Sequence, residues 1–539
     1  MHFPARPVAL VGAVITLLAT TVGVASGVPV PASAHHRGVS AAHLPPRLST
    51  TGTLGDGGVD DAYGDVVGDA TMWARDMVLH PQTTSASAGT GSESSGSGGT
   101  VSARTTTERA SVGGPARFDF PFVMCSTDGH ICVHYTNTAP DTATDAYALE
   151  VLNTLDSIYG EYQASGYRMP LDDGTTGPGP TTQTGGPNAG AAVPASATDI
   201  YLADVGNLGY YGYCAPTGAT NPISAHTKSA YCVLDNDYAS SQFPRGTQES
   251  NLDVTAAHEF FHAVQFSYDA YEDSWFMEST AVWMEDEVFT AINDNTQYLR
   301  YGPLGRPAQS LDKDTAYGVY GGWIFFRWLT EHRPALVGQL PGLVLSMWQR
   351  AADGPSSNEY SLEAVTNAMA AAGLPMRTAF ARFAAANRDP WHTYSEGAAN
   401  HYPIARPTGS HTLRSHGRNA GSVRINHLAA ATERFKTRVG HRHAKLRLSV
   451  DMAAKKYGTD AVVTVFLRGG GTQVRMFHLN AAGRGALTVP FSSRKVKRVE
   501  LTMTNASTRM HCWTQDSYSC DGTPRDQNQL ERYAASVRG

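Results

Sequence analysis

The sequence predicts an α+β fold that ends in a β-sandwich, on the basis of three changes of pattern along its 539 residues. Between residues 118 and 333, short apolar runs and a long helical pattern indicate a mixed sheet with helices. Alanine-rich helical patterns over residues 335–398 indicate a helical half. Beyond Pro407 the apolar period shortens to two, which is typical of half-buried strands. A chain of this length has room for two or three domains.

The N-terminus has the layout of a secretory signal peptide. A single basic residue, Arg6, precedes an apolar run over residues 8–25, and small residues then end at Ala34, a suitable cleavage point. An uncleaved membrane anchor is the alternative, but Gly and Thr residues interrupt the run. We therefore expect residues 1–34 to be removed, and the mature chain to be secreted without a membrane span.

Six cysteines, an even number, agree with export to an oxidising compartment. Many pairings are possible, and pairing by proximity is the simplest. It gives Cys125 with Cys132, Cys214 with Cys232, and Cys512 with Cys520. None of the spacings is CxxC, which argues against a cysteine-ligated zinc finger.

Residues 35–115 differ from the rest of the chain. They contain no cysteine, and residues 83–107 are mostly Ser, Thr and Gly. Such a composition buries too little apolar surface to offset the entropy of ordering, so we expect a flexible linker. The part before the linker is interpreted as a propeptide or a spacer. Two domains would follow, over residues 116–400 and 401–539.

Four elements are expected in the mixed layer. Apolar runs predict strands at residues 131–135, 199–202 and 230–234, and helical spacing predicts a helix over 142–163. The second predicted disulfide would clip the loop between the last two strands onto the sheet.

The next segment carries the candidate chemistry. It lacks Gly and Pro and predicts a helix capped by Asp253 or Thr255. His258 and His262 are four positions apart, so both imidazoles point the same way and can reach one zinc ion. Glu259 is turned about 100° around the axis, beside the metal, where it can act as a general base toward water. The alternative is a core helix with two hydrogen-bonded histidines.

A catalytic zinc needs a third protein ligand and an open position. His258, Glu259 and His262 form an H-E-x-x-H motif. Metzincin peptidases continue this motif as H-E-x-x-H-x-x-G-x-x-H, but Gln265 and Tyr268 stand here in the places of that Gly and last His. Gluzincin peptidases instead use a glutamate from the next helix. Glu278 lies among apolar residues, where an ionised carboxylate is costly unless it is paired or bound to metal. Four neighbouring carboxylates are expected in solvent: Glu272, Asp273, Asp286 and Glu287.

Residues 255–287 resemble a gluzincin metallopeptidase core. The sharpest parts are A-A-H-E-F-F-H-A-V-Q and E-S-T-A-V-W-M-E-D, and W-F-M-E-S-T-A is similar to the W-L-N-E-G-F-A of the aminopeptidase branch. From about Phe120 onward, the chain also resembles a group of secreted bacterial metalloproteases. The resemblance implies a zincin-like fold, one catalytic Zn²⁺ and hydrolysis of peptide bonds.

The motifs also depart from the family. Val282 stands where thermolysin-like members have Asp, and the G-x-M-E-N exopeptidase motif is absent. Glu285 is the candidate hydrogen-bond acceptor behind a metal-bound histidine. Gluzincins stabilise the oxyanion with a tyrosine or histidine, and Tyr320 or Tyr317 could fill that role here. Both tyrosines could equally be packed in the core.

The C-terminal part contains four segments with strand-like alternation. They are residues 445–450, 461–467, 473–477 and 499–504. We interpret residues 401–539 as a β-sandwich closed at its end by the third predicted disulfide.

Charge is divided unevenly along the chain. Residues 401–510 contain 20 Lys and Arg against 4 Asp and Glu, although the whole chain has 42 against 48. One interpretation is an ordinary solvated basic surface without a binding partner. Because the basic residues cluster, we expect this region to bind an anionic cell-surface polymer. No nucleic-acid partner is expected.

The sequence therefore predicts a secreted zinc metallopeptidase that acts on protein or peptide substrates. Two alternatives remain, a zinc hydrolase of non-peptide substrates and an adhesion or binding protein that retains a zinc site. Structural zinc sites are usually closed by a fourth protein ligand, and no Cys or His pair near residues 258–285 offers one.

Overall fold

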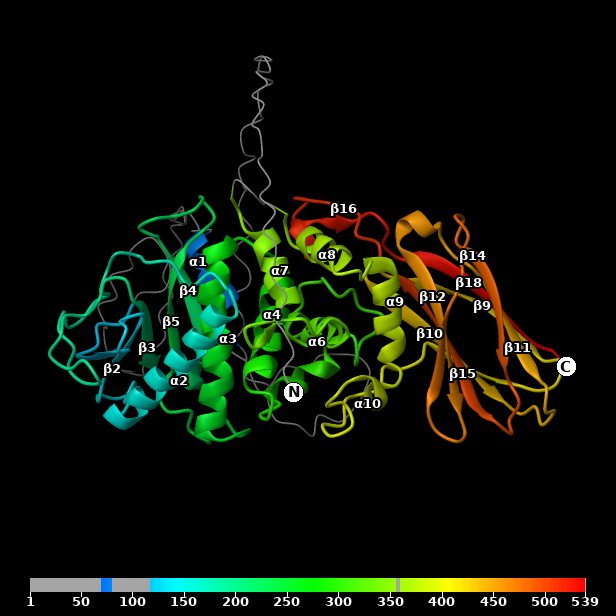
Figure 1. Cartoon of the computed structure of the whole chain (residues 1–539), viewed down its shortest axis with the longest axis horizontal. Coiled ribbons are helices and arrows are strands. Elements are labelled where there is room, and N and C mark those ends of the chain that lie inside the picture. The colour runs from blue at the N-terminus through cyan, green and yellow to red at the C-terminus, as the bar shows by residue number, and fades with distance from the viewer. Residues whose placement is uncertain (1–68, 80–116, 355–358, 539) are drawn as a thin grey trace, which may run out of the picture. The chain divides into compact units, whose positions relative to one another are not determined.

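The computed structural model describes residues 69–79, 117–354 and 359–538 (Figure 1). All of these belong to one compact unit, Ala41–Gly539. The predicted signal peptide and the predicted Ser/Thr/Gly linker lie outside the described residues. Across the three described ranges, no helix combines the length and the apolar character that a membrane span requires.

A five-stranded mixed sheet forms the first layer. Its strands are β1 (Phe122–Cys125), β2 (Ile131–Tyr135), β3 (Thr198–Ala203), β4 (Gly212–Thr217) and β5 (Ser229–Asp235). Their order is β1-β2-β3-β5-β4. β2, β3 and β5 run parallel, whereas β1 and β4 pair antiparallel at the two edges. The helices α2 (Asp145–Ala164) and α3 (Gln248–Asp269) lie along this sheet (Figure 1).

The predicted strands and helix of this layer are confirmed, but two strands are additional. The segment expected to be a loop between β3 and β5 contains β4, and Cys214 lies in β4 directly opposite Cys232. The loop prediction was therefore wrong. β4 was not predicted because it contains Gly212 and Pro216, residues that usually indicate a loop. Proline is tolerated in a strand at a sheet edge, and β4 lies at such an edge.

Helices occupy most of the chain between residues 248 and 393. After α3 come α4 (Ser274–Val288), η2 (Asp294–Arg300), α5 (Gly318–Gly321), α6 (Trp323–His332), α7 (Gly342–Ala351), α8 (Leu362–Ala371), α9 (Met376–Ala386) and α10 (Pro390–Thr393). Thr247 caps α3 in a capping box with Ser250, so the expected cap at Asp253 or Thr255 was wrong. The signal that determines this start lies upstream of the segment from which the helix was predicted.

Three of the four carboxylates expected in solvent are buried, which corrects that prediction. Glu272 accepts from the Ser361 amide at 3.0 Å, and Asp273 accepts from the Cys520 amide at 2.8 Å. Asp286 is 3.0 Å from the guanidinium of Arg327. Glu287 is half-buried beside the same arginine. Partners that are distant in the sequence therefore compensate for the burial of these charges.

Two further sheets follow residue 408. One has the order β13-β12-β15-β10-β8 and the other β14-β11-β18-β9, and their facing side chains form one hydrophobic cluster. The bounds are β8 (Gly409–Leu413), β9 (Arg418–Ile425), β10 (Ala429–Thr437), β11 (Lys445–Asp451), β12 (Thr459–Leu467), β13 (Thr472–Met476), β14 (Arg484–Pro490), β15 (Val496–Asn505) and β18 (Gln529–Arg538). The four predicted strands are β11, β12, β13 and β15. β10 was not predicted from the sequence. Both faces of this strand are covered over most of its length, so buried and exposed residues do not alternate along it.

The outer face of the β12–β15–β10 sheet is covered by α9 and the residues that follow it. Glu500 on β15 is fully buried and binds the guanidinium of Arg388 at 2.7 and 3.0 Å. Arg434 and Arg498 also donate to Glu500, each at 2.8 Å. Arg434 and Arg498, two of the 20 Lys and Arg residues of the basic region 401–510, are therefore paired internally. Most of the other basic residues of that region are exposed.

The three disulfides are those that proximity in the sequence predicts. They join Cys125 to Cys132, Cys214 to Cys232, and Cys512 to Cys520. The second of them links β4 to β5 directly beneath the motif helix α3, since Cys214 Sγ lies 2.8 Å from the Glu259 carbonyl oxygen.

Candidate metal centre

Four side chains from three elements converge on one point. His258 and His262 project from successive turns of α3, and Glu278 faces them from α4. Asp69 comes from the residues just before α1 (Thr71–Leu79). One ligand atom from each residue lies within 4.8 Å of all the others. The four residues therefore form a candidate metal-binding group.

The distances around this point are short and even. Glu278 Oε2 is 3.2 Å from His258 Nε2 and 3.6 Å from His262 Nε2. Asp69 Oδ2 is 3.6 Å from His258 Nε2 and 3.5 Å from His262 Nε2. These atoms surround a common centre and are not arranged as separate pairs.

The outer nitrogen of each imidazole has a hydrogen-bond partner that fixes its orientation. Glu285 Oε1 is 2.6 Å from His258 Nδ1, and Gln265 Oε1 is 2.7 Å from His262 Nδ1. The Gln265 amide nitrogen is itself held by the Met277 carbonyl at 3.0 Å. The amide oxygen of Gln265 and an ionised carboxylate at Glu285 can only accept, so Nδ1 is the donor in both bonds and Nε2 of each imidazole faces the centre. Burial raises the pKa of Glu285 to about 7, against the lowering effect of His258.

The centre contains buried polar atoms without hydrogen bonds. Within the described part of the chain, His262 Nε2, Asp69 Oδ2 and Glu278 Oε1 have no hydrogen-bond partner. Leaving such a buried group without a partner typically costs about 1–3 kcal/mol. A cation bound between the two Nε2 atoms, Asp69 Oδ2 and Glu278 Oε2 would satisfy His262 Nε2 and Asp69 Oδ2 together, so the donor set fits a metal ion.

Glu259 lies beside the four ligands and does not belong to them. Its Oε2 accepts from the Thr71 hydroxyl at 2.8 Å, and its Oε1 lacks a hydrogen bond to any described residue. Burial, and next the negative charge of Asp69, raise the pKa of Glu259 well above its usual range. Gly212 makes room for it, because a Cβ there would be 3.1 Å from Glu259 Cγ and 2.8 Å from the Val233 carbonyl oxygen.

Of the two candidate tyrosines, the structure brings one to the centre. The Tyr320 ring lies 6.4 Å from the His258 ring, and its hydroxyl donates to the Asp69 carbonyl at 3.4 Å. Burial raises the pKa of Tyr320 well above its usual value, so the hydroxyl remains a donor. Tyr317 instead packs against Tyr301 with the two rings tilted and their centroids 5.0 Å apart.

Sequence reasoning missed three residues of this site. Asp69 and Thr71 lie in a segment without a recognisable motif, more than 170 residues before α3. Gln265 was used only to exclude the metzincin class. Its spacing of three residues from His262 places it on the same helix face and could have revealed it.

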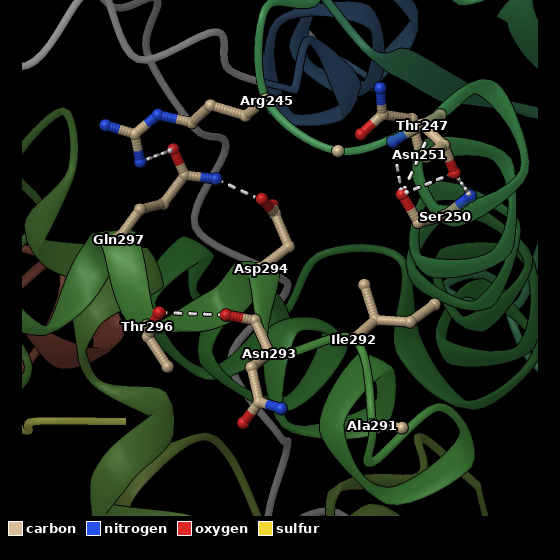
Figure 2. A pocket seen from close by; sticks show the side chains of 11 residues that line it. Arg245, Thr247, Ser250, Asn251, Ala291, Ile292, Asn293, Asp294, Thr296 and Gln297 are labelled. Carbon is tan, nitrogen blue, oxygen red and sulfur yellow. Dashed lines mark hydrogen bonds between the residues drawn. The ribbon is translucent and has the colours of Figure 1, made fainter. Parts of the chain in front are cut away.

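A cavity of about 410 Å³ lies between the start of α3 and the residues around η2 (Figure 2). The start of α3 and the residues around η2 line it, and Arg245, Gln297 and Asp294 are joined across it by hydrogen bonds of 3.2 and 2.6 Å.

Comparisons with known proteins give no family for this chain. A scan against protein-family models finds no match, and no curated protein matches. Among solved structures, the pre-peptidase C-terminal domain of a Bacillus anthracis collagenase is 12% identical, with 25% of this chain and 98% of that chain covered and a TM-score of 0.15. A periplasmic inhibitor of g-type lysozyme, PliG of Aeromonas hydrophila, is 12% identical over 24% of this chain and 98% of that chain, with a TM-score of 0.13. A family GH115 4-O-methyl-α-glucuronidase is 7% identical over 65% of this chain and 56% of that chain, with a TM-score of 0.14.

Proposed function

We propose that the protein is a secreted zinc peptidase of the gluzincin type, with a zincin-like domain followed by a β-sandwich. The single observation that carries this proposal is the convergence of His258, His262 and Glu278 on one point with Glu259 beside them. Two histidines one helical turn apart, a carboxylate from the next helix and an adjacent free carboxylate are the parts that metal-assisted hydrolysis requires.

The spacing of the ligand atoms fits zinc. Zinc binds nitrogen and carboxylate oxygen at about 2.0–2.2 Å in a tetrahedron, so its ligand atoms lie about 3.3–3.6 Å from one another. The four measured separations between carboxylate oxygens and imidazole nitrogens run from 3.2 to 3.6 Å. A ligand set of nitrogen and oxygen without sulfur also suits zinc.

Zinc bound at this centre would supply Lewis-acid polarisation of a substrate carbonyl and acidification of water. Glu259 would take the proton of the attacking water, since it lies beside the four ligands and its Oε1 has no hydrogen-bond partner among the described residues. Tyr320 would donate its hydroxyl hydrogen bond to the oxyanion. Glu285 and Gln265 would hold the two imidazoles in the productive tautomer.

The edge strand supports a peptide as the substrate. β4 pairs with β5 on one side and is the last strand of its sheet, beside Glu259. An extended peptide can add to such an edge through its backbone N–H and carbonyl groups. This arrangement would bring a scissile carbonyl up to the metal in the register of the strand.

One observation favours a second function, a structural zinc site. Asp69 supplies the fourth protein ligand that the sequence around residues 258–285 lacks, and four protein ligands are typical of structural zinc. A structural zinc site would not require Glu259, which is buried and is not one of the four candidate ligands. Burying a carboxylate without a charged partner costs free energy. The presence of Glu259 therefore favours catalysis.

Secretion is supported by the disulfides. Three disulfides are typical of proteins that mature in an oxidising compartment. The signal peptide predicted at residues 1–34 would provide the route.

The roles are tested by the zinc content of purified variants and by their peptide hydrolysis, measured in the intact chain and after a cut within residues 83–107. Glu259→Gln should retain about one zinc per chain and lose hydrolysis by about 10²–10⁴-fold, because it removes the base and leaves the ligands. His262→Ala and Glu278→Ala should lose zinc and activity together. Glu363→Gln, at an exposed position of α8, is the matched control. Full zinc content in Glu278→Ala would show that the third ligand is assigned wrongly.

A further inference from the structure

The segment formed by Asp69, Ala70 and α1 lies across the candidate centre and touches each of its working groups. We propose that this segment is a built-in pseudosubstrate, which holds the peptidase latent by placing Asp69 on the metal as its fourth ligand. The inference rests on the proposed function and concerns the regulation of the same site.

The Asp69 carboxylate is fixed in the position of a ligand. Its Oδ1 accepts from the Thr71 amide at 2.8 Å, which turns Oδ2 toward His258 and His262. Oδ2 is buried and makes no hydrogen bond of its own with the described residues. A catalytic zinc keeps its fourth position for water or substrate, and Asp69 takes that place here.

The groups expected to act on a substrate are also engaged by this segment. The Thr71 hydroxyl donates to Glu259, the proposed base, at 2.8 Å. The Tyr320 hydroxyl donates to the backbone carbonyl of Asp69, as it would to the carbonyl of a scissile bond. The proposed metal position, Glu259 and Tyr320 are therefore all contacted by one continuous stretch, residues 69–71.

The same stretch occupies the edge of the sheet. The Ala70 amide donates to the Gly212 carbonyl at 3.2 Å, and the Cys214 amide donates to the Thr71 hydroxyl at 2.8 Å. A peptide bound along β4 would need these backbone groups for itself. Substrate and segment therefore exclude each other.

Separate contacts keep α1 in place. The Arg75 guanidinium is buried, donates to the Glu272 carbonyl at 2.7 Å and lies 3.1 Å from Met277 Sδ. Ala74 is fully buried in a cluster with side chains of β4. Replacing Asp69 should therefore open the metal position without dislodging the helix.

The segment could be released by a cut downstream. It is joined to the rest of the chain through residues 80–116, which include the Ser/Thr/Gly-rich tract. A cut there ends the high effective concentration of a tethered segment, so the segment can leave on dilution. The segment has no cysteine that could bind the metal as a thiolate. Binding of the Asp69 carboxylate to the metal would hold the peptidase latent without one.

The test is binding of acetohydroxamate, a small zinc ligand, to the zinc-loaded full chain by calorimetry. Asp69→Ala and Asp69→Asn should bind at least about tenfold more tightly than the wild type, because apparent affinity scales with the fraction of open sites. The cobalt-substituted chain should also change its visible absorption in both variants. Asp76→Asn removes a more exposed carboxylate of the same helix and should change neither signal.

A second arm uses the full chain with a specific protease site placed within residues 83–107. Cutting and dialysis should raise hydroxamate binding to the level of Asp69→Ala.

Three results would overturn the inference. Equal hydroxamate binding and equal cobalt spectra in wild type and both Asp69 variants would remove Asp69 from the metal. Loss of zinc in Asp69→Ala and Asp69→Asn would favour a structural four-ligand site. A wild-type chain without bound zinc would overturn the proposed function itself, and the latency with it.

Discussion

The hydrogen bond behind His258 provides a quantitative test of how the centre is built. Glu285 Oε1 lies 2.6 Å from His258 Nδ1, and both groups are buried. Glu285→Ala removes the acceptor that fixes the imidazole, and the loss of such a partner typically weakens metal binding by about 10–100-fold. That factor corresponds to about 1.4–2.8 kcal/mol. Zinc affinity is measured by competition with a chromophoric chelator at constant pH.

The conservative variant separates orientation from packing. Glu285→Gln keeps the shape and an accepting oxygen, so most of the zinc affinity should remain. Gln265→Ala should weaken binding by a similar factor, since Gln265 supports His262 in the same way. Glu363→Ala, on the exposed face of α8, serves as the control. Unchanged zinc affinity in both Glu285→Ala and Gln265→Ala would refute the assignment of the histidine tautomers.

Three further predictions concern the frame around the centre. Glu500→Ala leaves the buried Arg388 without its charge partner and should destabilise the chain by about 3–5 kcal/mol, measured by calorimetry against wild type; a loss below 1 kcal/mol would contradict it. Gly212→Ala should lower peptide hydrolysis and stability together, because its Cβ would meet the Val233 carbonyl oxygen at 2.8 Å; wild-type values of both would refute this. The full chain should be retained on a sulfated polysaccharide matrix at low salt and elute well below 1 M, because screening shortens from about 10 Å at 0.1 M to about 3 Å at 1 M. Retention that is indifferent to salt would exclude an electrostatic origin.

The local pattern of the motif helix was sufficient to predict a large part of the site. Spacing of four along a helix put His258 and His262 on one face, and their Nε2 atoms do face one centre. The cost of a lone carboxylate among apolar residues pointed to Glu278, which is fully buried opposite them. Both arguments depend only on neighbours in the sequence.

The parts that could not be predicted depend on contacts between distant segments. Asp69 reaches the centre from a segment more than 170 residues before α3, and no local rule links the two. Glu272 and Asp286 have charged surroundings in the sequence, which resemble a solvated face. Their burial is made possible by Ser361 and Arg327, which only the fold brings near.

The strands show the same division. β11 alternates because only one of its faces meets the cluster between the two sheets, and β15 alternates in sequence between apolar and polar residues although both of its faces are buried, so period two revealed both strands. β10 is covered on both faces and carries no alternation. β4 contains Gly212 and Pro216, residues that usually mark loops, and is accepted as a strand only because it lies at an edge.

X-ray absorption at the zinc edge of the zinc-loaded full chain tests the central claim most directly. The account predicts one zinc per chain with four nitrogen or oxygen ligands at about 2.0–2.2 Å, two of them imidazoles. Glu278→Ala should lose that signal, whereas Glu259→Gln should preserve it. A sulfur shell at about 2.3 Å, or a zinc signal that survives the loss of both His262 and Glu278, would contradict it.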